Sequence, residues 1–224
     1  MPMVLKGIPA APGIAIGKAR IRLNETRISS GARAGSPEAE LARFGLAVER
    51  ARTELGEIIG RVASRAGEKE ADIFRSQLLM LDDPLLAGSI KTAILEDACS
   101  AEDAVDRVAR DLAERFRALD NQRLQERAVD VGDVGQRLAR NLSGAREPRP
   151  AGAGILFASS LTPSEVSLLD PAEVAGIVTE QGGATGHAAI LARALNIAAV
   201  MGLKDVLALV HDGSGRRRPV WVCF

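Results

Sequence analysis

The sequence predicts an α/β region combined with an all-helical region. Short apolar runs of extended character occur near the start of the chain and again after residue 150. Between them, apolar residues recur at three- and four-residue spacing, which is typical of amphipathic helices. After Arg146-Glu-Pro-Arg-Pro150, which is typical of a linker, strand-like and helix-like runs alternate. Such alternation is the pattern of an α/β fold.

The first extended run contains Ile14, Ile16, Ala19, Ile21 and Leu23, and its mostly alternating character predicts a strand. A long helix follows. Ser36 is its expected N-cap and a proline follows at the first helical position. The apolar stripe of this helix comprises Leu41, Phe44, Val48, Ala51, Leu55, Ile58 and Val62.

Further helices are predicted up to Gly144. Residues 68–81 form one, stopped by Asp82-Asp83-Pro84, and residues 85–98 form a short one after it. Ser100-Ala-Glu-Asp103 resembles a capping box that opens another. The last runs over residues 124–142. Because the connections are short, we expect neighbouring helices to pack antiparallel.

After the linker, three short strands are expected at residues 155–158, 175–179 and 198–201. Helices are expected between them at residues 164–169 and 188–195. No internal repeat and no low-complexity tract occurs in the sequence.

Composition narrows the classes of partner. The 224 residues include 29 Lys and Arg and 29 Asp and Glu, so the formal net charge is zero. A neutral chain argues against nucleic acid or an acidic membrane surface as partner. Cys99 and Cys223 lie far apart and form no metal or redox spacing. Without a signal peptide or a membrane-spanning apolar run, we expect a cytoplasmic chain with reduced thiols.

The stretch Gly182-Gly183-Ala184-Thr185-Gly186-His187 places a histidine between a glycine-rich loop and a helix-forming run. Helix N-termini carry unpaired N–H groups and the positive end of the helix dipole, which favour a bound anion. Glycines let backbone amides approach that anion closely. His187 is therefore predicted to be a nucleophile beside a phosphate site. The other histidine, His211, precedes a turn signal and is expected to be solvated.

Four stretches that run nearly from end to end of the chain occur in the order of a known family. Together they resemble Enzyme I, the phosphoenolpyruvate-protein phosphotransferase of the bacterial sugar phosphotransferase system. The stretches are Gly7-Ile-Pro-Ala-Ala-Pro-Gly-Ile-Ala-Ile-Gly17, Glu70-Ala-Asp-Ile-Phe74 with Leu78-Leu-Met-Leu-Asp-Asp-Pro84, Glu126-Arg-Ala-Val-Asp-Val-Gly-Asp-Val134 with Arg137-Leu138, and the Gly-Gly-x-Thr-x-His segment that ends at His187.

The resemblance implies a fold and an activity. An α/β phosphohistidine domain of the swivelling β/α type would comprise residues 1–24 and 147–224, and an inserted all-α helical bundle would comprise residues 25–146. His187 would accept a phosphoryl group on Nε2, from phosphoenolpyruvate in the full-length enzyme, and pass it to a histidine of the phosphocarrier protein HPr. No cofactor is expected in this chain. Mg²⁺ is implied only for the phosphoenolpyruvate-binding barrel, which this sequence is expected to lack.

The resemblance also implies which residues form the sites. Gly182, Gly183, Thr185, Gly186 and Thr162 would position the phosphoryl group, and HPr would bind at Met80, Asp83, Leu86, Leu124 and Arg127. The residues themselves leave alternatives open. Thr162 or Ser164 is a suitable helix N-cap, and the apolar residues around the Asp-Asp-Pro break also suit a helical core.

Three positions depart from the family pattern. Ala184 replaces a common Arg, Gly186 replaces a Ser, and Val166 stands where a Thr is frequent. Fewer side chains are then available to hold the imidazole or the phosphoryl group. Two other functions stay open: the phosphohistidine domain of a dikinase-type or dihydroxyacetone-kinase-linked phosphotransferase, and a regulatory HPr-binding module without turnover. The long helical segment favours Enzyme I over the dikinases, which are not expected to contain it.

Overall fold

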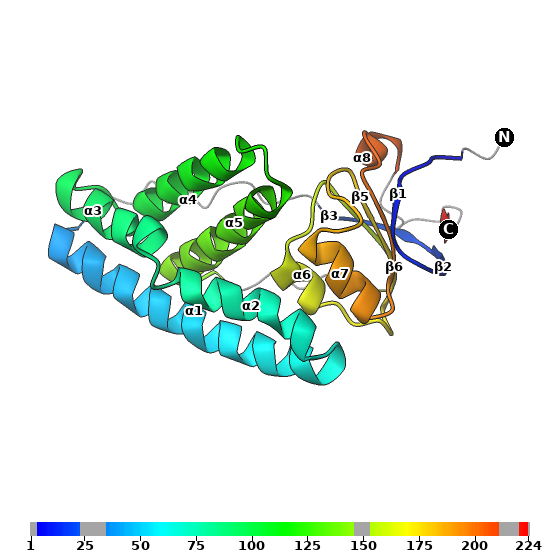
Figure 1. Cartoon of the computed structure of the whole chain (residues 1–224), viewed down its shortest axis with the longest axis horizontal. Helices are drawn as coiled ribbons and strands as arrows, with labels where there is room; N and C mark the ends of the chain where they lie inside the picture. The colour runs from blue at the N-terminus through cyan, green and yellow to red at the C-terminus, as the bar shows by residue number, and fades with distance from the viewer. Residues whose placement is uncertain (1–3, 23–34, 146–152, 211–219, 224) are drawn as a thin grey trace. The chain divides into compact units, whose positions relative to one another are not determined.

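The computed structural model describes residues 4–22, 35–145, 153–210 and 220–223 (Figure 1). The chain divides into two compact units. The sheet unit comprises Met1–Glu25, Val62–Glu70 and Pro148–Phe224, and the helical unit comprises Thr26–Arg61 and Ala71–Glu147. The sequence-based division differs from this one chiefly at Val62–Glu70, which it placed with the helices.

The sheet unit contains a five-stranded sheet with the strand order β1-β6-β5-β4-β3. β3, β4, β5 and β6 run parallel, and β1 joins the edge antiparallel to β6. This mixed sheet and the separate helical region confirm the predicted fold class. The strand bounds are β1 Ile8–Ala11, β3 Ala19–Arg22, β4 Gly154–Ala158, β5 Val174–Thr179 and β6 Ala198–Met201.

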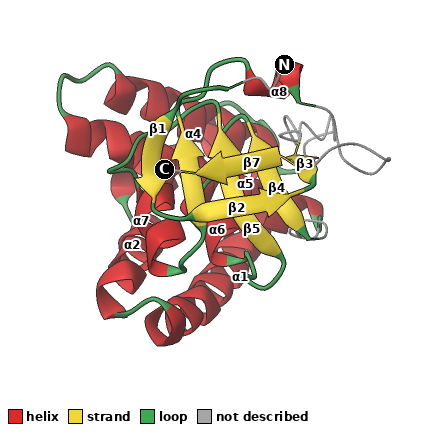
Figure 2. Cartoon of the chain, turned by 90° about the vertical axis from the view of Figure 1, so that its right-hand side faces the viewer, coloured by secondary structure: helices red, strands yellow, loops and turns green. Residues whose placement is uncertain are grey.

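A second, two-stranded sheet is formed by β2 (Ile14–Gly17) and β7 (Val220–Cys223), which pair antiparallel. Figure 2 shows β2 and β7 in front of the larger sheet. Contact between the layers is close because Gly176 on β5 has no side chain. A Cβ atom added there would lie 2.8 Å from the Cβ of Ala15 on β2. Small residues therefore set the spacing between the two sheets.

The core on this side of the larger sheet is apolar. It comprises Ala15, Ala19, Ile155, Phe157, Val178, Ala198 and Val206. Val206 begins the short helix α8 (Val206–Leu209). The other helices of the sheet unit are α6 (Pro163–Ser167) and α7 (His187–Ala194), which pack against each other.

The edges of the larger sheet carry features that discourage pairing with a further strand. β3, at one edge, carries Arg20 and Arg22. β1, at the other, contains Pro9, and its register against β6 shifts between Pro9 and Ala11. Charges, proline and bulges are the usual means of protecting a sheet edge.

The helical unit is built from helices that end where the sequence indicates. Asp83 caps the turn that follows the Asp-Asp-Pro break, Ser100 caps α4, and Gly144 ends α5 in the left-handed conformation with φ of 70°. The predicted helix 85–98 is a short π-helix followed by an α-helix. The bounds are α1 Pro37–Arg65, α2 Glu68–Met80, η1 Pro84–Gly88, α3 Ser89–Glu96, α4 Ala101–Arg117 and α5 Gln122–Ser143. The last residues of α1 and the first residues of α2 belong to the sheet unit.

Buried polar side chains connect the helices of this unit. Arg137 on α5 is 0% exposed, and its guanidinium donates to Glu54 on α1 at 2.5 Å. The amide nitrogen of Gln77 on α2 donates to Asp133 on α5 at 3.0 Å. Such buried groups require partners, so the helices can pack only in an arrangement that supplies them.

A third polar contact joins the first turns of α1 and α4. The carboxylate of Glu40 accepts from the backbone N–H of Ala101 at 2.9 Å, from that of Gly35 at 3.0 Å and from the guanidinium of Arg43 at 2.8 Å. Arg43 also pairs with Glu102. Burial alone would raise the pKa of Glu40, but these hydrogen bonds and the Arg43 charge hold it below the ordinary value of 4.5.

Candidate active site

His187 is the first residue of α7, and it is half-buried. The preceding residue, Gly186, is the N-cap, with extended φ of −64° and ψ of 155°, and it makes no side-chain cap. A glycine N-cap leaves the first-turn N–H groups without a capping side chain, and the positive end of the helix dipole lies at the same place. The structure thus places the imidazole next to backbone donors suited to an anion.

The loop that leads to His187 is shaped by its glycines. Gly182 has φ of 106°, a conformation that side chains disfavour, and a Cβ atom there would lie 3.3 Å from the sulfur of Met201. The N–H of Gly186 donates to the carbonyl of Gly183 at 3.3 Å, which closes a turn. The predicted residues Gly182, Gly183, Thr185, Gly186 and His187 therefore belong to one compact loop that enters α7.

Thr162 is the N-cap of α6, as the capping interpretation predicts. Its hydroxyl accepts from the N–H of Glu165 at 3.3 Å, and the Glu165 carboxylate accepts from the N–H of Thr162 at 2.8 Å. The same carboxylate pairs with Arg22 at the end of β3. A contact of Thr162 with a phosphoryl group stays a prediction. Val166, on the same helix, is fully buried and apolar, so it offers the imidazole no hydrogen bond.

The residues predicted to bind HPr separate into two groups. Met80 and Leu86 are only 6% and 1% exposed. They lie on the inward sides of α2 and η1, so they are core residues and unsuitable as surface anchors, which corrects their predicted role. The exposed apolar residues at this break are Leu79, at 75%, and Leu85, at 62%. The break between the helices lies where the sequence predicts it.

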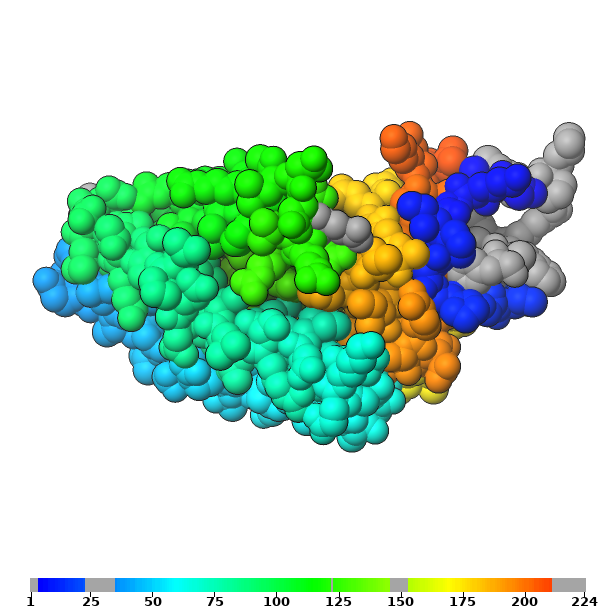
Figure 3. Space-filling model, viewed as in Figure 1, coloured from blue at the N-terminus to red at the C-terminus, as the bar shows by residue number. Residues whose placement is uncertain are grey.

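The other predicted contacts lie at or near the surface. Asp83 is half-buried, and its side chain accepts from the N–H of Leu85 at 2.8 Å. Leu124, in the first turns of α5, is half-buried, and Arg127 is exposed. Figure 3 shows that α2, η1 and α3, in turquoise shades, form part of the surface in that view.

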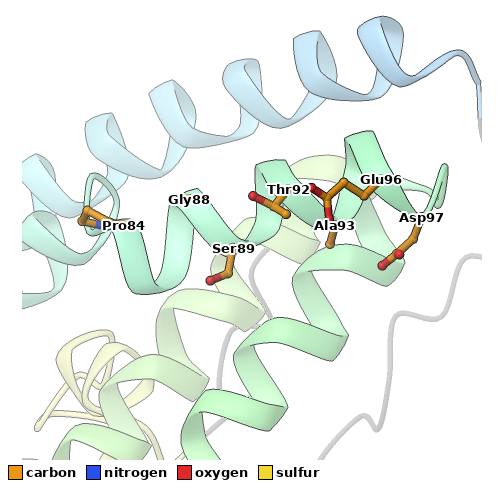
Figure 4. A pocket seen from close by; sticks show the side chains of 7 residues that line it. All are labelled: Pro84, Gly88, Ser89, Thr92, Ala93, Glu96 and Asp97. Atoms are coloured by element: carbon orange, nitrogen blue, oxygen red, sulfur yellow. The ribbon is translucent and has the colours of Figure 1, made fainter.

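A shallow pocket occurs on η1 and α3, and none of the predicted site residues lines it (Figure 4). Its acidic members, Glu96 and Asp97, lie at one end. Within the described ranges, no three His, Cys, Asp or Glu side chains form a group that could hold a metal ion. The lining residues are Pro84, Gly88, Ser89, Thr92, Ala93, Glu96 and Asp97.

Two site features were missed by sequence reasoning. Arg193, in the last turn of α7, donates to the carbonyl of Ala184 in the loop at 2.8 Å. The pair of Arg22 with Glu165 ties β3 to α6. Neither pairing has a local signal, because the partners meet only through the tertiary fold.

Of the helices in the part of the chain that the structure describes, none combines the length and apolar character needed to cross a membrane.

Comparison with known proteins identifies the family to which the chain belongs. Residues 6–127 match the family described as PEP-utilising enzyme, N-terminal, and residues 151–216 match PEP-utilising enzyme, mobile domain. A phosphoenolpyruvate-protein phosphotransferase of Bacillus sp. (strain S) is 40% identical over 213 residues, which are 93% of this chain and 37% of that protein. The enzyme of Bacillus subtilis (strain 168) is 38% identical over 213 residues, with the same coverage of 93% and 37%.

Solved structures agree. The solution structure of Enzyme I (nEIt) is 34% identical with a TM-score of 0.65, and the match covers 94% of this chain and 87% of that one. The N-terminal domain of Enzyme 1 – Nitrogen is 31% identical with a TM-score of 0.62, and the match covers 98% and 90%. The chain spans 37% of the length of the curated relatives above. It belongs to the phosphoenolpyruvate-utilising enzymes, and within them to the Enzyme I family, whose N-terminal part it matches.

Proposed function

We propose that this chain is the phosphohistidine part of a phosphoenolpyruvate-protein phosphotransferase, in which His187 carries the phosphoryl group. The observation that carries the proposal is the position of His187, at the first residue of α7 directly after the glycine loop. The names of the curated relatives support the same activity. In the sugar phosphotransferase system the group would come from phosphoenolpyruvate and pass to a histidine of HPr.

The proposed step exchanges one phosphorus–nitrogen bond for another. The step can be followed from phospho-HPr to this chain, which is the reverse of the transfer to HPr. The unprotonated Nε2 of His187 attacks the phosphorus of phospho-HPr, and the bond from phosphorus to the HPr imidazole breaks as the new bond forms. The electron pair of the broken bond stays on the HPr nitrogen. Nδ1 of His187 keeps its proton throughout, so the phosphorylated imidazole ring carries a positive charge. This charge makes the imidazole a good leaving group when the phosphoryl group is transferred again.

Backbone groups would provide most of the stabilisation. Ala184, Gly186 and Val166 present no polar side chain at positions where the family pattern has one. In the proposal, backbone N–H groups of the loop and of the first turn of α7 donate to the phosphoryl oxygens. Because they are held by the fold before the reaction, they need no reorganisation as charge develops.

Phosphoenolpyruvate and Mg²⁺ have no assigned place among the described residues. In the proposal they act at the barrel domain that the resemblance implies for the longer relatives. The isolated chain would then accept a phosphoryl group from phospho-HPr but not from phosphoenolpyruvate with Mg²⁺. No other cofactor takes part in the transfer.

The proposed HPr surface lies on the helical unit. It comprises Leu79, Asp83, Leu85, Leu124 and Arg127, which are exposed or half-buried. Exposed leucines next to charged residues form the kind of patch that binds a small protein partner, with the apolar side chains as anchors. Met80 and Leu86 would support this surface from below.

The main test is labelling of the chain by phospho-HPr, followed by mass spectrometry under non-acidic conditions. We expect one phosphoryl group on the wild-type chain and none on His187→Ala, with an unchanged thermal melt. His211→Ala, at a position outside the described residues, is the matched control and should label normally. Phosphorylation of histidine in the His187 variant, or rapid labelling of the wild type by phosphoenolpyruvate alone, would contradict the proposal.

The docking surface has its own test, in which an exposed leucine is compared with a buried neighbour. Leu79→Ala should weaken HPr binding by about 1–3 kcal/mol and leave the melt unchanged, because the side chain contacts solvent in the free chain. Met80→Ala should lower the melting temperature through loss of core packing. Titration with HPr and thermal melting of both variants decide the matter: normal affinity in Leu79→Ala would remove that residue from the surface.

A further inference from the structure

Arg193 connects three segments of the sheet unit. Its Nε and Nη2 donate to the carbonyl oxygen of Ala10 on β1, at 3.2 and 2.9 Å. Nη2 also donates to the carbonyl oxygen of Ala184 in the glycine loop, at 2.8 Å. One guanidinium therefore joins the helix that begins at His187, the loop before that helix and an edge strand of the sheet.

The anchor on β1 is a carbonyl at an irregular point of the strand. Ala10 lies between Pro9, paired with Val200, and Ala11, paired with Ala199, so it has no partner of its own in the register. It is 3% exposed. A bulge typically leaves a backbone group without its ladder bond, and a buried carbonyl there needs another donor. Arg193 supplies that donor through a forked, charge-assisted contact.

The contact of Arg193 with the carbonyl of Ala184 fixes the orientation of a peptide group in the loop. Gly182 turns the chain with its positive φ, and Gly186 closes back on Gly183, so Ala184 lies at the middle of the loop. The carbonyl of Ala184 and the N–H of Thr185 belong to one planar peptide and point in opposite directions. Holding the carbonyl toward Arg193 thus directs the N–H of Thr185 away from Arg193.

We propose that Arg193 is a positioning residue for phosphoryl transfer, which fixes the loop amides beside His187 by tying Ala184 to the bulge at Ala10. This inference rests on the proposed function of His187. The forked guanidinium is suited to the task because it reaches two carbonyls at once in a fixed plane, whereas a lysine ammonium is a single flexible point charge. A site that relies on backbone donors needs those donors held in place.

The test compares Arg193→Gln and Arg193→Lys in single-turnover labelling by phospho-HPr. We expect the rate at saturating donor to fall about tenfold or more in both variants, since a small displacement of positioned groups has effects of this order. The concentration of phospho-HPr that gives half the maximal rate should not change. Full activity of the lysine variant would show that charge alone suffices, and would overturn the positioning role.

Arg65→Gln is the matched control. Arg65 also belongs to the sheet unit, and its Nη2 donates to a backbone carbonyl, that of Leu169, at 3.3 Å without touching the loop. It should label at the wild-type rate. Thermal melts accompany each variant, and a rate loss in Arg193→Gln that only follows a loss of folded protein would overturn the inference.

The contact of Arg193 with Ala10 and Ala184, called the clamp here, can also be tested without the reaction, by amide hydrogen exchange. The Gly186 amide, bonded to Gly183, should exchange roughly tenfold faster in Arg193→Gln and at the wild-type rate in Arg65→Gln. If the wild-type chain is not labelled by phospho-HPr, the proposed function is wrong. The exchange rate of the Gly186 amide in Arg193→Gln then decides by itself whether Arg193 holds the loop. If labelling succeeds and neither its rate nor the exchange changes in Arg193→Gln, the clamp fails alone.

Discussion

The two units of this chain both have apolar cores, but they differ in the charged groups buried among the apolar residues. The buried charged residues of the described chain all lie in the helical unit, and they are Glu40, Glu102, Asp130, Asp133 and Arg137. The buried polar residues of the sheet unit are Ser164, Ser167 and Thr179, whose groups are neutral. Its layers approach through small residues such as Ala15 and Gly176. Small residues also pack closely in the helical unit, where a Cβ atom added at Gly135 would lie 2.6 Å from the Cβ of Ala109. Buried charged groups are therefore what distinguishes the interior of the helical unit.

The difference has a physical basis in the roles proposed for the units. A phosphoryl carrier needs backbone donors at fixed positions, and tight packing of small residues on short elements provides them. A helical bundle with similar apolar faces can pack in several ways. Buried polar pairs restrict it to the one arrangement that satisfies them, which in other proteins has been found to favour specificity over stability.

The largest effect should come from Arg137. We expect Arg137→Met, which keeps most of the side-chain volume but removes the guanidinium, to destabilise the helical unit by about 3 kcal/mol, because the bond between the buried guanidinium and Glu54 is lost. Urea unfolding followed by helical circular dichroism measures this. Amide hydrogen exchange of β4 and β5 serves as the probe of the sheet unit.

Glu54→Gln is the control for that variant. Glu54 is the exposed member of the pair, with 40% of its side chain accessible, so its neutralisation should have a much smaller effect. A loss in Arg137→Met no larger than that in Glu54→Gln would show that the buried charge does not organise the bundle.

A smaller effect of a different kind is expected at Gly176. In Gly176→Ala the new Cβ atom would lie 2.8 Å from Ala15 and 3.3 Å from the carbonyl oxygen of Ala198, so a strand must shift. Overpacking of this kind costs about 1–3 kcal/mol. The loss should be seen in the amide hydrogen exchange of β4 and β5. Gly56→Ala, on an open face of α1 with nothing within 4 Å of the new atom, should instead stabilise by about 0.5–1 kcal/mol.

The smallest effect concerns pH. The pKa of Glu40 in the folded state is below its ordinary value of 4.5. Its contribution to the free energy of unfolding is therefore complete at pH values above the unfolded-state pKa, and it is lost as the pH falls through the folded-state pKa. We expect Glu40→Gln to cost about 1 kcal/mol at pH 7, through weaker hydrogen bonds, and almost nothing in strong acid. Unfolding midpoints from pH 7 to pH 3 decide this: a constant difference between variant and wild type would exclude linkage to Glu40.

Much of the fold could be predicted from the sequence because its signals are local. The cap at Ser100, the break at Asp82-Asp83-Pro84 and the glycine before His187 each act over a few residues, and each lies where it was expected. The resemblance implied HPr contacts at Met80 and Leu86, whereas the exposed residues of the same apolar run are Leu79 and Leu85. Periodicity cannot tell an inward leucine from an outward one in such a run.

Contacts between distant segments could not be predicted. Arg193 reaches Ala10, Arg22 reaches Glu165, and Arg137 reaches Glu54, and in each case the two residues are brought together only when the whole unit has folded. Nothing near an arginine in the sequence tells which carbonyl or carboxylate it will meet. The burial of charged residues in the helical unit could not be predicted for the same reason.

The pairing of β3 with β4 has a consequence for the order of folding. The two strands lie side by side in parallel, yet the whole helical unit separates them in the sequence. During synthesis β1 and β3 leave the ribosome long before β4, β5 and β6 exist to receive them, while the helices can form from local contacts as they emerge. Closing so long a loop is slow, so the sheet should form last. Until those strands are made, the nascent chain therefore depends on the proline of β1 and the arginines of β3 to limit aggregation.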